Sequence, residues 1–128
     1  MRFILMSTSN ENKRVAPPTP ELMAAIGKLT EEMTKEGKLI STGGLMPSAR
    51  GARLHLSGGR VTVTDGPFTE AKEMIGGYAI VQVQSKEEAI ELGKRFLKIH
   101  ADILGPSYET ESEIRQMFDP SDFGPQKR

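Results

Sequence analysis

The clearest constraint on the fold is a pair of alternating segments, 52–56 and 60–64, joined by Ser57-Gly58-Gly59. A Gly-Gly connection is typical of a tight β-hairpin, because both turn residues then need a positive φ, which glycine adopts at little cost. Pairing Ser57 with Arg60 predicts these cross-strand neighbours: Leu56 with Val61, Leu54 with Val63, His55 with Thr62, and Arg53 with Thr64. Like side chains then share a face, which supports this register.

The two faces of the predicted hairpin have different expected environments. We expect the apolar face to pack on helices; it carries Leu54, Leu56, Val61 and Val63. The polar face is either solvated or lines a polar cavity; it carries Arg53, His55, Thr62 and Thr64.

The second hairpin strand ends sharply at Asp65-Gly66-Pro67. Proline has no N–H to give to a sheet, so the chain turns there and leaves the Asp65 side chain at the mouth of the turn. We expect a helical turn at 69–74 and a further strand at 77–83.

The first part of the chain predicts a strand, a helix and a second strand. Residues 3–6 are apolar on both faces, as in a central strand. Thr19-Pro20-Glu21 begins a helix, because it offers a capping hydroxyl, a proline at the first position and an acid in the first turn. Gly37 ends that helix, and the strand that begins at Leu39 is interrupted by Gly43-Gly44.

The last part of the chain predicts a second helix and a final strand. Ser85 and Glu88 form a capping box at the helix start, and Glu91 pairs with Arg95 on its outer side. His100 lies at the end of this helix, where a cation suits the helix dipole. Residues 101–110 are expected to form a loop, and residues 114–118 a strand.

This order of elements predicts an α+β fold: an antiparallel sheet with two helices on one face, as in the ferredoxin-like sandwich. Residues 1–118 are expected to form a single domain, and residues 119–128 a polar C-terminal tail. The sheet face without helices needs a cover, and a homodimer that stacks two such sheets would provide it.

Composition argues against several classes of function. The chain has 17 basic and 17 acidic residues, so it lacks the basic face of a nucleic-acid-binding protein or the charge of a membrane-surface protein. It has no cysteine, and its two histidines are far apart without an acid at ligand spacing, so no metal site is expected. No segment has the length of a signal peptide or a membrane span, which predicts a cytoplasmic protein.

The segment Asp65-Gly66-Pro67-Phe68-Thr69-Glu70-Ala71-Lys72-Glu73, followed by Gly76-Gly77-Tyr78, resembles the signature of the DGPF group in the YCII-related (YciI-like) family. Further similarity lies in Gly44-Leu45-Met46-Pro47, Gly51-Ala52-Arg53, Ser57-Gly58-Gly59 and Glu113-Ile114-Arg115-Gln116-Met117. The resemblance implies a ferredoxin-like fold that dimerises as a dimeric α/β barrel. It also implies a histidine and aspartate pair as an acid/base site; Asp65 matches the aspartate, whereas Leu22-Met23-Ala24 stands where the histidine is expected.

Each candidate site residue has a functional and a structural interpretation. Asp65 is a general base or ligand anchor, or it only closes its turn by bonding its own backbone. His55 is a proton shuttle, or a surface histidine beside Thr62. Arg53 holds an anionic ligand, or pairs with a surface acid. Tyr78 stacks on a ligand, or fills the barrel.

Two functions follow from these candidates. In the first, a cavity of the homodimer binds a small organic molecule and uses no organic cofactor. Asp65 and His55 transfer protons, and the ligand is contacted by Arg53, Thr62 and Tyr78. In the second, the protein is a non-catalytic module that senses a ligand or binds a partner protein. Whether the protein is an enzyme stays open at this point.

Overall fold

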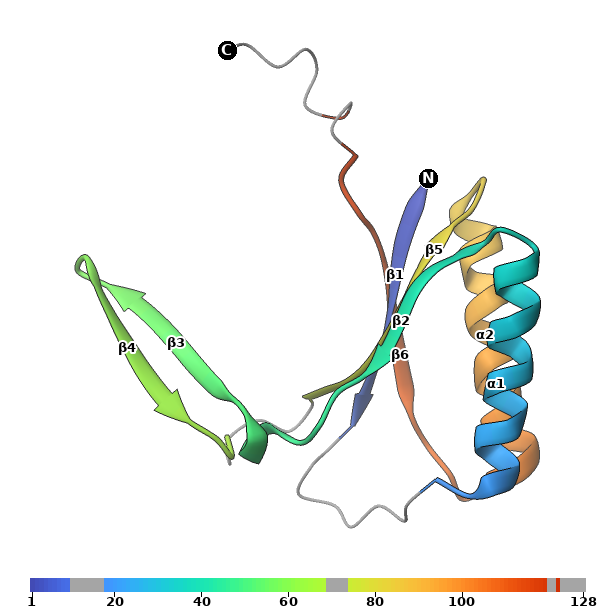
Figure 1. Ribbon diagram of the computed structural model, residues 1–128, viewed down its shortest axis with the longest axis horizontal. Coiled ribbons are helices and arrows are strands. Elements are labelled where there is room, and N and C mark those ends of the chain that lie inside the picture. The colour runs from blue at the N-terminus through green and yellow to red at the C-terminus, as the bar shows by residue number, and fades with distance from the viewer. Residues whose placement is uncertain (10–17, 69–73, 120–121, 123–128) are drawn as a thin grey trace.

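The main sheet has the strand order of a ferredoxin-like fold. The computed structural model describes residues 1–9, 18–68, 74–119 and 122. Within these residues, a sheet of four antiparallel strands has the order β2-β5-β1-β6 (Figure 1). The strands are β1 (Arg2–Ser9), β2 (Leu39–Gly44), β5 (Met74–Gln82) and β6 (Glu111–Gln116). Helices α1 (Pro20–Lys35) and α2 (Lys86–Leu104) cover one face, which confirms the predicted α+β class.

Both helices begin at the predicted capping residues. The Thr19 hydroxyl accepts a hydrogen bond from the Leu22 N–H at 3.1 Å, and the Ser85 hydroxyl accepts one from the Glu88 N–H at 3.1 Å. The Glu88 carboxylate accepts from the N–H of Gln84, one residue before the position that a capping box predicts. Each cap satisfies a backbone donor that the first helical turn leaves without an intrahelical partner.

The core lies between the helices and the sheet. Alternate residues of the central strands, Phe3 and Leu5 on β1 and Val81 on β5, point toward the helices and are buried. Gly93 allows α2 to approach closely, since a Cβ there would lie 3.3 Å from Ile114 Cδ1. The buried cluster comprises Phe3, Leu5, Leu29, Met33, Val81, Val83, Ala89 and Leu92.

Three predicted strand boundaries were wrong. Strand β2 continues through Gly43 and Gly44, because both pair with β5. Strand β5 begins at Met74, so Met74 does not belong to the helical turn that was expected at 69–74. Residues 69–73 lie outside the described part of the chain. Strand β6 is Glu111–Gln116 and not 114–118, since its pairing with β1 runs from Thr8 to Phe3.

The predicted end and outer ion pair of α2 were also wrong. The helix continues to Leu104, so His100 lies within it. Arg95 contacts Glu32 of α1 at 3.1 Å, and Glu91 pairs instead with Lys94 at 3.5 Å. An ion pair between the helices therefore replaces the predicted pair along one helix. Of the predicted tail, the structure describes only Asp119 and Asp122.

The hairpin has the predicted register but not the predicted packing. Strands β3 (Ala52–Ser57) and β4 (Arg60–Asp65) pair as expected, with Leu56 opposite Val61 and His55 opposite Thr62. They form a separate sheet that extends away from the main sheet on the side opposite the helices (Figure 1). We call residues 52–65 the arm. Its apolar face does not pack on the helices; Leu54, Leu56, Val61 and Val63 are all exposed.

Candidate functional site

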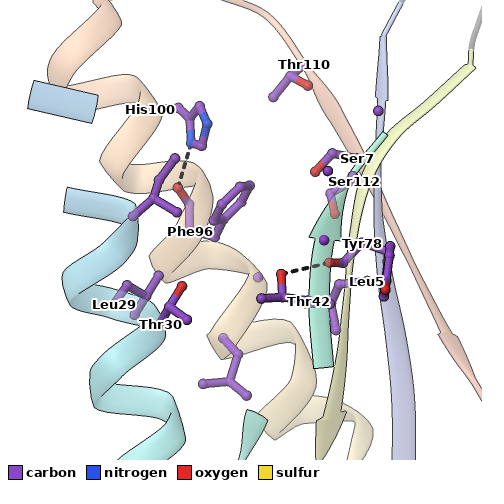
Figure 2. Close-up of a pocket in the computed structure, with 18 of the residues that line it drawn as sticks. Leu5, Ser7, Leu29, Thr30, Thr42, Tyr78, Phe96, His100, Thr110 and Ser112 are labelled. Atoms are coloured by element: carbon purple, nitrogen blue, oxygen red, sulfur yellow. Dashed lines mark hydrogen bonds between the residues drawn. The ribbon is translucent and has the colours of Figure 1, made fainter. Parts of the chain in front are cut away.

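A cavity of about 470 Å³ lies between the helices and the main sheet (Figure 2). Its apolar lining comes from both layers and includes Leu5, Leu29, Leu39, Leu92 and Phe96. Its polar lining includes Ser7, Thr30, Thr42, His100, Tyr108, Thr110 and Ser112. Among the described lining residues there is no lysine, arginine, aspartate or glutamate, so the cavity favours an uncharged or weakly charged guest.

The cavity exists partly because two paired strand residues have no side chain. Gly44 on β2 pairs with Gly77 on β5, which in turn pairs with Ser7 on β1. These positions follow the alternation of Leu5 and Ala79, so their side chains would point toward the helices. A Cβ on Gly44 would meet nothing nearer than the Gly76 carbonyl oxygen at 4.0 Å. Gly44, which was predicted to interrupt the strand together with Gly43, therefore opens space beside it.

His100 is the cavity-lining group that sequence reasoning missed. Its side chain points from α2 into the space between the layers, and the residue is 9% exposed. The imidazole Nδ1 lies 2.9 Å from the Phe96 carbonyl oxygen, so Nδ1 carries a proton and donates it. The ring is further held by Phe96, at 4.5 Å between centroids, and by Tyr108, at 5.8 Å.

This arrangement leaves the second ring nitrogen of His100 for a guest molecule. Among the described residues, Nε2 has no hydrogen-bond partner. In the neutral imidazole with its proton on Nδ1, Nε2 accepts a hydrogen bond; in the imidazolium it donates one. The spacing of Phe96 and His100, four residues apart on the inner side of α2, was the signal that could have identified this residue.

The residues predicted from the arm are not brought to this cavity. Arg53, His55 and Thr62 are exposed on the polar face of the arm. The Arg53 guanidinium lies over the Phe68 ring, with 4.1 Å between Cζ and the ring centroid. The Thr62 hydroxyl donates to the His55 carbonyl oxygen at 3.4 Å. These contacts hold the arm and its base together.

Asp65 is separated from the groups that were expected to assist it. It pairs with Ala52 at the base of the arm and is exposed. Strand alternation places Asp65 with Val63 and Leu54, on the face opposite His55 and Arg53. Within one chain, the Asp65 side chain therefore does not meet those of His55 and Arg53, as the predicted site required.

Tyr78 lies on the sheet face without helices. It pairs with Met6 on β1 and Gly43 on β2, and its ring points away from the helices in Figure 2. A Cβ on Gly43 would lie 3.0 Å from Tyr78 Cε1, so the ring covers this glycine. Tyr78 contributes to the cavity boundary, while its ring belongs to the opposite surface.

The loop after Asp65 is fixed to the short 3-10 helix Ser48–Arg50. The Gly66 N–H donates to the Gly51 carbonyl oxygen at 3.0 Å, and the Phe68 N–H donates to the Ser48 hydroxyl at 3.2 Å. A Cβ on Gly66 would overlap the Ser48 carbonyl oxygen. This segment therefore has a demonstrable structural role at the base of the arm.

The residues that the structure describes contain neither a metal-binding cluster nor a membrane-spanning helix. No group of three or more His, Asp or Glu side chains in this part of the chain could hold a metal ion. None of the helices that the structure describes is long and apolar enough to cross a membrane.

Comparison with known proteins identifies the family. The chain is 30% identical over 73 residues to an uncharacterised protein of Rhizobium meliloti (strain 1021); the matched segment covers 57% of this chain and 59% of that protein. The family model of the YCII-related domain matches residues 1–103, which include every element from β1 to most of α2. Assignment to the narrower DGPF group stays a prediction. The chain belongs to the YCII-related family.

Proposed function

We propose that the protein binds a small, mainly apolar organic molecule in the cavity between its helices and its main sheet. The observation that carries this proposal is the combination of a volume of about 470 Å³ with an apolar lining and one fixed imidazole. Ligand sites for small molecules typically measure roughly 300–1,000 Å³ and combine apolar walls with a few placed polar groups.

The lining favours a guest with one polar group at one end. An aromatic or alicyclic body would replace water against Leu29, Leu92 and Phe96. A hydroxyl, carbonyl or carboxyl group would then meet His100 Nε2, and the hydroxyls of the sheet strands would supply further hydrogen bonds. With this contact His100 can accept a proton from a weakly acidic guest and return it, which is general acid–base catalysis.

A second candidate site lies at Asp65, in a cavity shared by two chains. Asp65 would act as the base there, with ligand contacts from Arg53, His55, Thr62 and Tyr78. The fixed loop beside Asp65 supports this candidate, since a held carboxylate is better positioned for chemistry. It requires a second chain, because Asp65 and His55 lie on opposite faces of the arm.

The binding proposal is tested with 2-naphthol as the probe, titrated into ¹⁵N-labelled protein and followed by NMR. We expect shifts at residues that line the cavity, from both α2 and β2. The variant Gly44→Leu fills the cavity and is expected to weaken binding by at least about tenfold, or about 1.4 kcal/mol. Gly27→Leu is the matched control, because a Cβ on Gly27 meets nothing within 4 Å and the residue lies outside the cavity lining.

The proposal fails if 2-naphthol shifts no cavity residue, or if Gly44→Leu binds it as tightly as Gly27→Leu does. His100→Gln separates binding from chemistry once a guest that reacts is found. Retained binding with lost turnover would support proton transfer by His100, and turnover equal to that of the unchanged protein would exclude it.

A further inference from the structure

A second pocket, of about 400 Å³, adjoins the cavity near the end of α2. It is lined by Leu97 and Ala101 of α2 and by Tyr108, Glu109 and Thr110 of the segment that leads into β6. All of these residues except Leu97 are exposed, and we therefore call it the surface pocket. Tyr108 and Thr110 also line the cavity, so the two spaces meet at these residues.

The segment between α2 and β6 is held at the point where the two spaces meet. Gly105 ends α2 with a φ of 86°, and its carbonyl oxygen accepts a hydrogen bond from the Tyr108 N–H at 3.2 Å. The Thr110 hydroxyl donates to the Thr8 carbonyl oxygen at 3.4 Å. The Tyr108 ring stacks on His100, and Figure 2 shows His100 and Thr110 at the same end of the space between helices and sheet. The junction is therefore built from groups with fixed positions.

The two spaces differ in charge. Among the described residues, no ionic side chain lines the cavity, whereas Glu109 lines the surface pocket. Within the described part of the chain, Glu109 forms no ion pair. The nearest charges along α2, Lys98 and Asp102, pair with each other at 2.8 Å. The surface pocket therefore carries an uncompensated negative charge next to an uncharged cavity.

We propose that the guest of the cavity is a primary amine with an apolar body, and that its ammonium group lies in the surface pocket at Glu109. This proposal rests on the ligand site proposed above and adds the charge of the guest. The apolar body fills the uncharged cavity, while the ammonium group stays at the surface and keeps part of its water. A primary ammonium has three N–H donors, which suit the Glu109 carboxylate and the Nε2 of a neutral His100. The aromatic ring of Tyr108 also attracts a cation.

Guests with other end groups fit the same two spaces less well. A carboxylate would either enter a cavity whose described lining has no lysine or arginine, or lie beside Glu109 and be repelled. A neutral alcohol would fill the cavity equally well but would gain no attraction from the Glu109 charge. For one apolar body, we therefore expect binding to weaken from ammonium to alcohol to carboxylate.

The experiment compares 2-(2-naphthyl)ethylamine, 2-(2-naphthyl)ethanol and 2-naphthylacetate, which share one ring system and differ in the end group. Each is titrated into ¹⁵N-labelled protein at neutral pH and followed by the NMR shifts of Gly44 and Gly77 in the cavity and of Ala101 and Glu109 in the surface pocket. We expect the amine to shift both sets and to bind at least about fivefold more tightly than the alcohol, because an exposed ion pair and a cation–π contact each contribute modestly.

The variant Glu109→Gln removes the charge and nearly keeps the shape of the side chain. We expect it to bring the affinity for the amine to within about twofold of that for the alcohol, and to leave the affinity for the alcohol unchanged. The matched control is Glu111→Gln, because Glu111 is also exposed and lines neither space. An equal loss of amine binding in both variants would overturn the assignment to Glu109.

The outcomes separate this proposal from the ligand site on which it rests. If the alcohol shifts the cavity residues and binds as tightly as the amine, the ammonium guest is overturned and the ligand site in the cavity stands. Tighter binding of 2-naphthylacetate than of the amine would have the same meaning. If none of the three probes shifts a cavity residue, both proposals fail. An amine that shifts only Ala101 and Glu109 would likewise overturn both, because its apolar body would then lie outside the cavity.

Discussion

At the scale of single residues, the two histidines of the chain have opposite surroundings. His100 is buried between Phe96 and Tyr108, whereas His55 is exposed on the arm. We expect His100→Ala to lower the free energy of unfolding by about 1–3 kcal/mol, because it removes a packed ring and leaves a larger cavity. His55→Ala, the matched control, should change it by less than about 0.5 kcal/mol. Urea denaturation measures both, and equal effects would contradict the burial of His100.

The hydrogen bond from His100 Nδ1 also predicts which tautomer is populated. Because the Phe96 carbonyl oxygen can only accept, the neutral imidazole should carry its proton on Nδ1. Two-bond ¹H–¹⁵N NMR spectra distinguish the two tautomers, and with only two histidines in the chain the assignment is direct. A neutral ring protonated on Nε2 would mean that Nδ1 does not donate to Phe96, and that Nε2 is not the acceptor offered to a guest.

Gly66 is predicted to be the least replaceable residue of the loop after Asp65. A Cβ there would overlap the Ser48 carbonyl oxygen, which is backbone and cannot rotate away. We expect Gly66→Ala to cost about 2–4 kcal/mol of unfolding free energy, as steric strain in a packed site does. Gly51→Ala is the matched control, since its Cβ would lie 3.7 Å from the same oxygen and its φ is −132°. A thermal or urea melt in which both variants behave alike would contradict this packing.

At the scale of elements, local sequence patterns determined much of what could be predicted. The register of the arm follows from the Gly58-Gly59 turn and strand alternation, both local properties, and was correct at each predicted pair. The helix starts follow from Thr19 and Ser85, which act within one turn of their own position. These features require no knowledge of the rest of the chain.

What could not be predicted depends on contacts between distant segments. Alternation shows that one face of the arm is apolar, but it does not show what covers that face. A Gly-Gly pair is expected to interrupt a strand, yet pairing with β5 keeps Gly43 and Gly44 in the sheet. The loop expected at 101–110 placed His100 at a helix end, and its cavity is formed partly by strands distant in sequence.

The contact between the two helices gives a prediction at this scale. Arg95 of α2 reaches Glu32 of α1 at 3.1 Å, while Glu91 pairs with Lys94. In double-mutant cycles we expect a coupling of about 0.2–1 kcal/mol between Arg95 and Glu32, since both side chains are partly exposed, and none between Arg95 and Glu91. The cycles use Arg95→Met with Glu32→Gln or Glu91→Gln. A larger coupling energy between Arg95 and Glu91 would show that the ion pair predicted along α2 forms after all.

At the scale of the whole molecule, the sheet face without helices and the proposed ligand site lie on opposite sides of the main sheet. The cavity lies between the sheet and the helices, whereas the Tyr78 ring lies on the other face, where a second chain would stack. Leu56→Lys with Val61→Lys places charges on the exposed apolar face of the arm and should weaken any association of two chains there. The variant should still bind 2-naphthol within about threefold of the unchanged chain, a difference below about 0.7 kcal/mol. NMR titration and sedimentation of the same samples measure the two properties together.

Measuring dimerisation and 2-naphthol binding separately decides between the two candidate sites. A site inside one chain keeps its walls when the dimer dissociates, so binding should persist. A site at Asp65 needs the second chain, because no group on the polar face of its own arm shares its side of the strand. Loss of binding together with dimerisation would therefore favour Asp65 and its shared cavity over His100. Binding that survives in the monomer, and that Gly44→Leu then abolishes, would place the guest between the helices and the sheet.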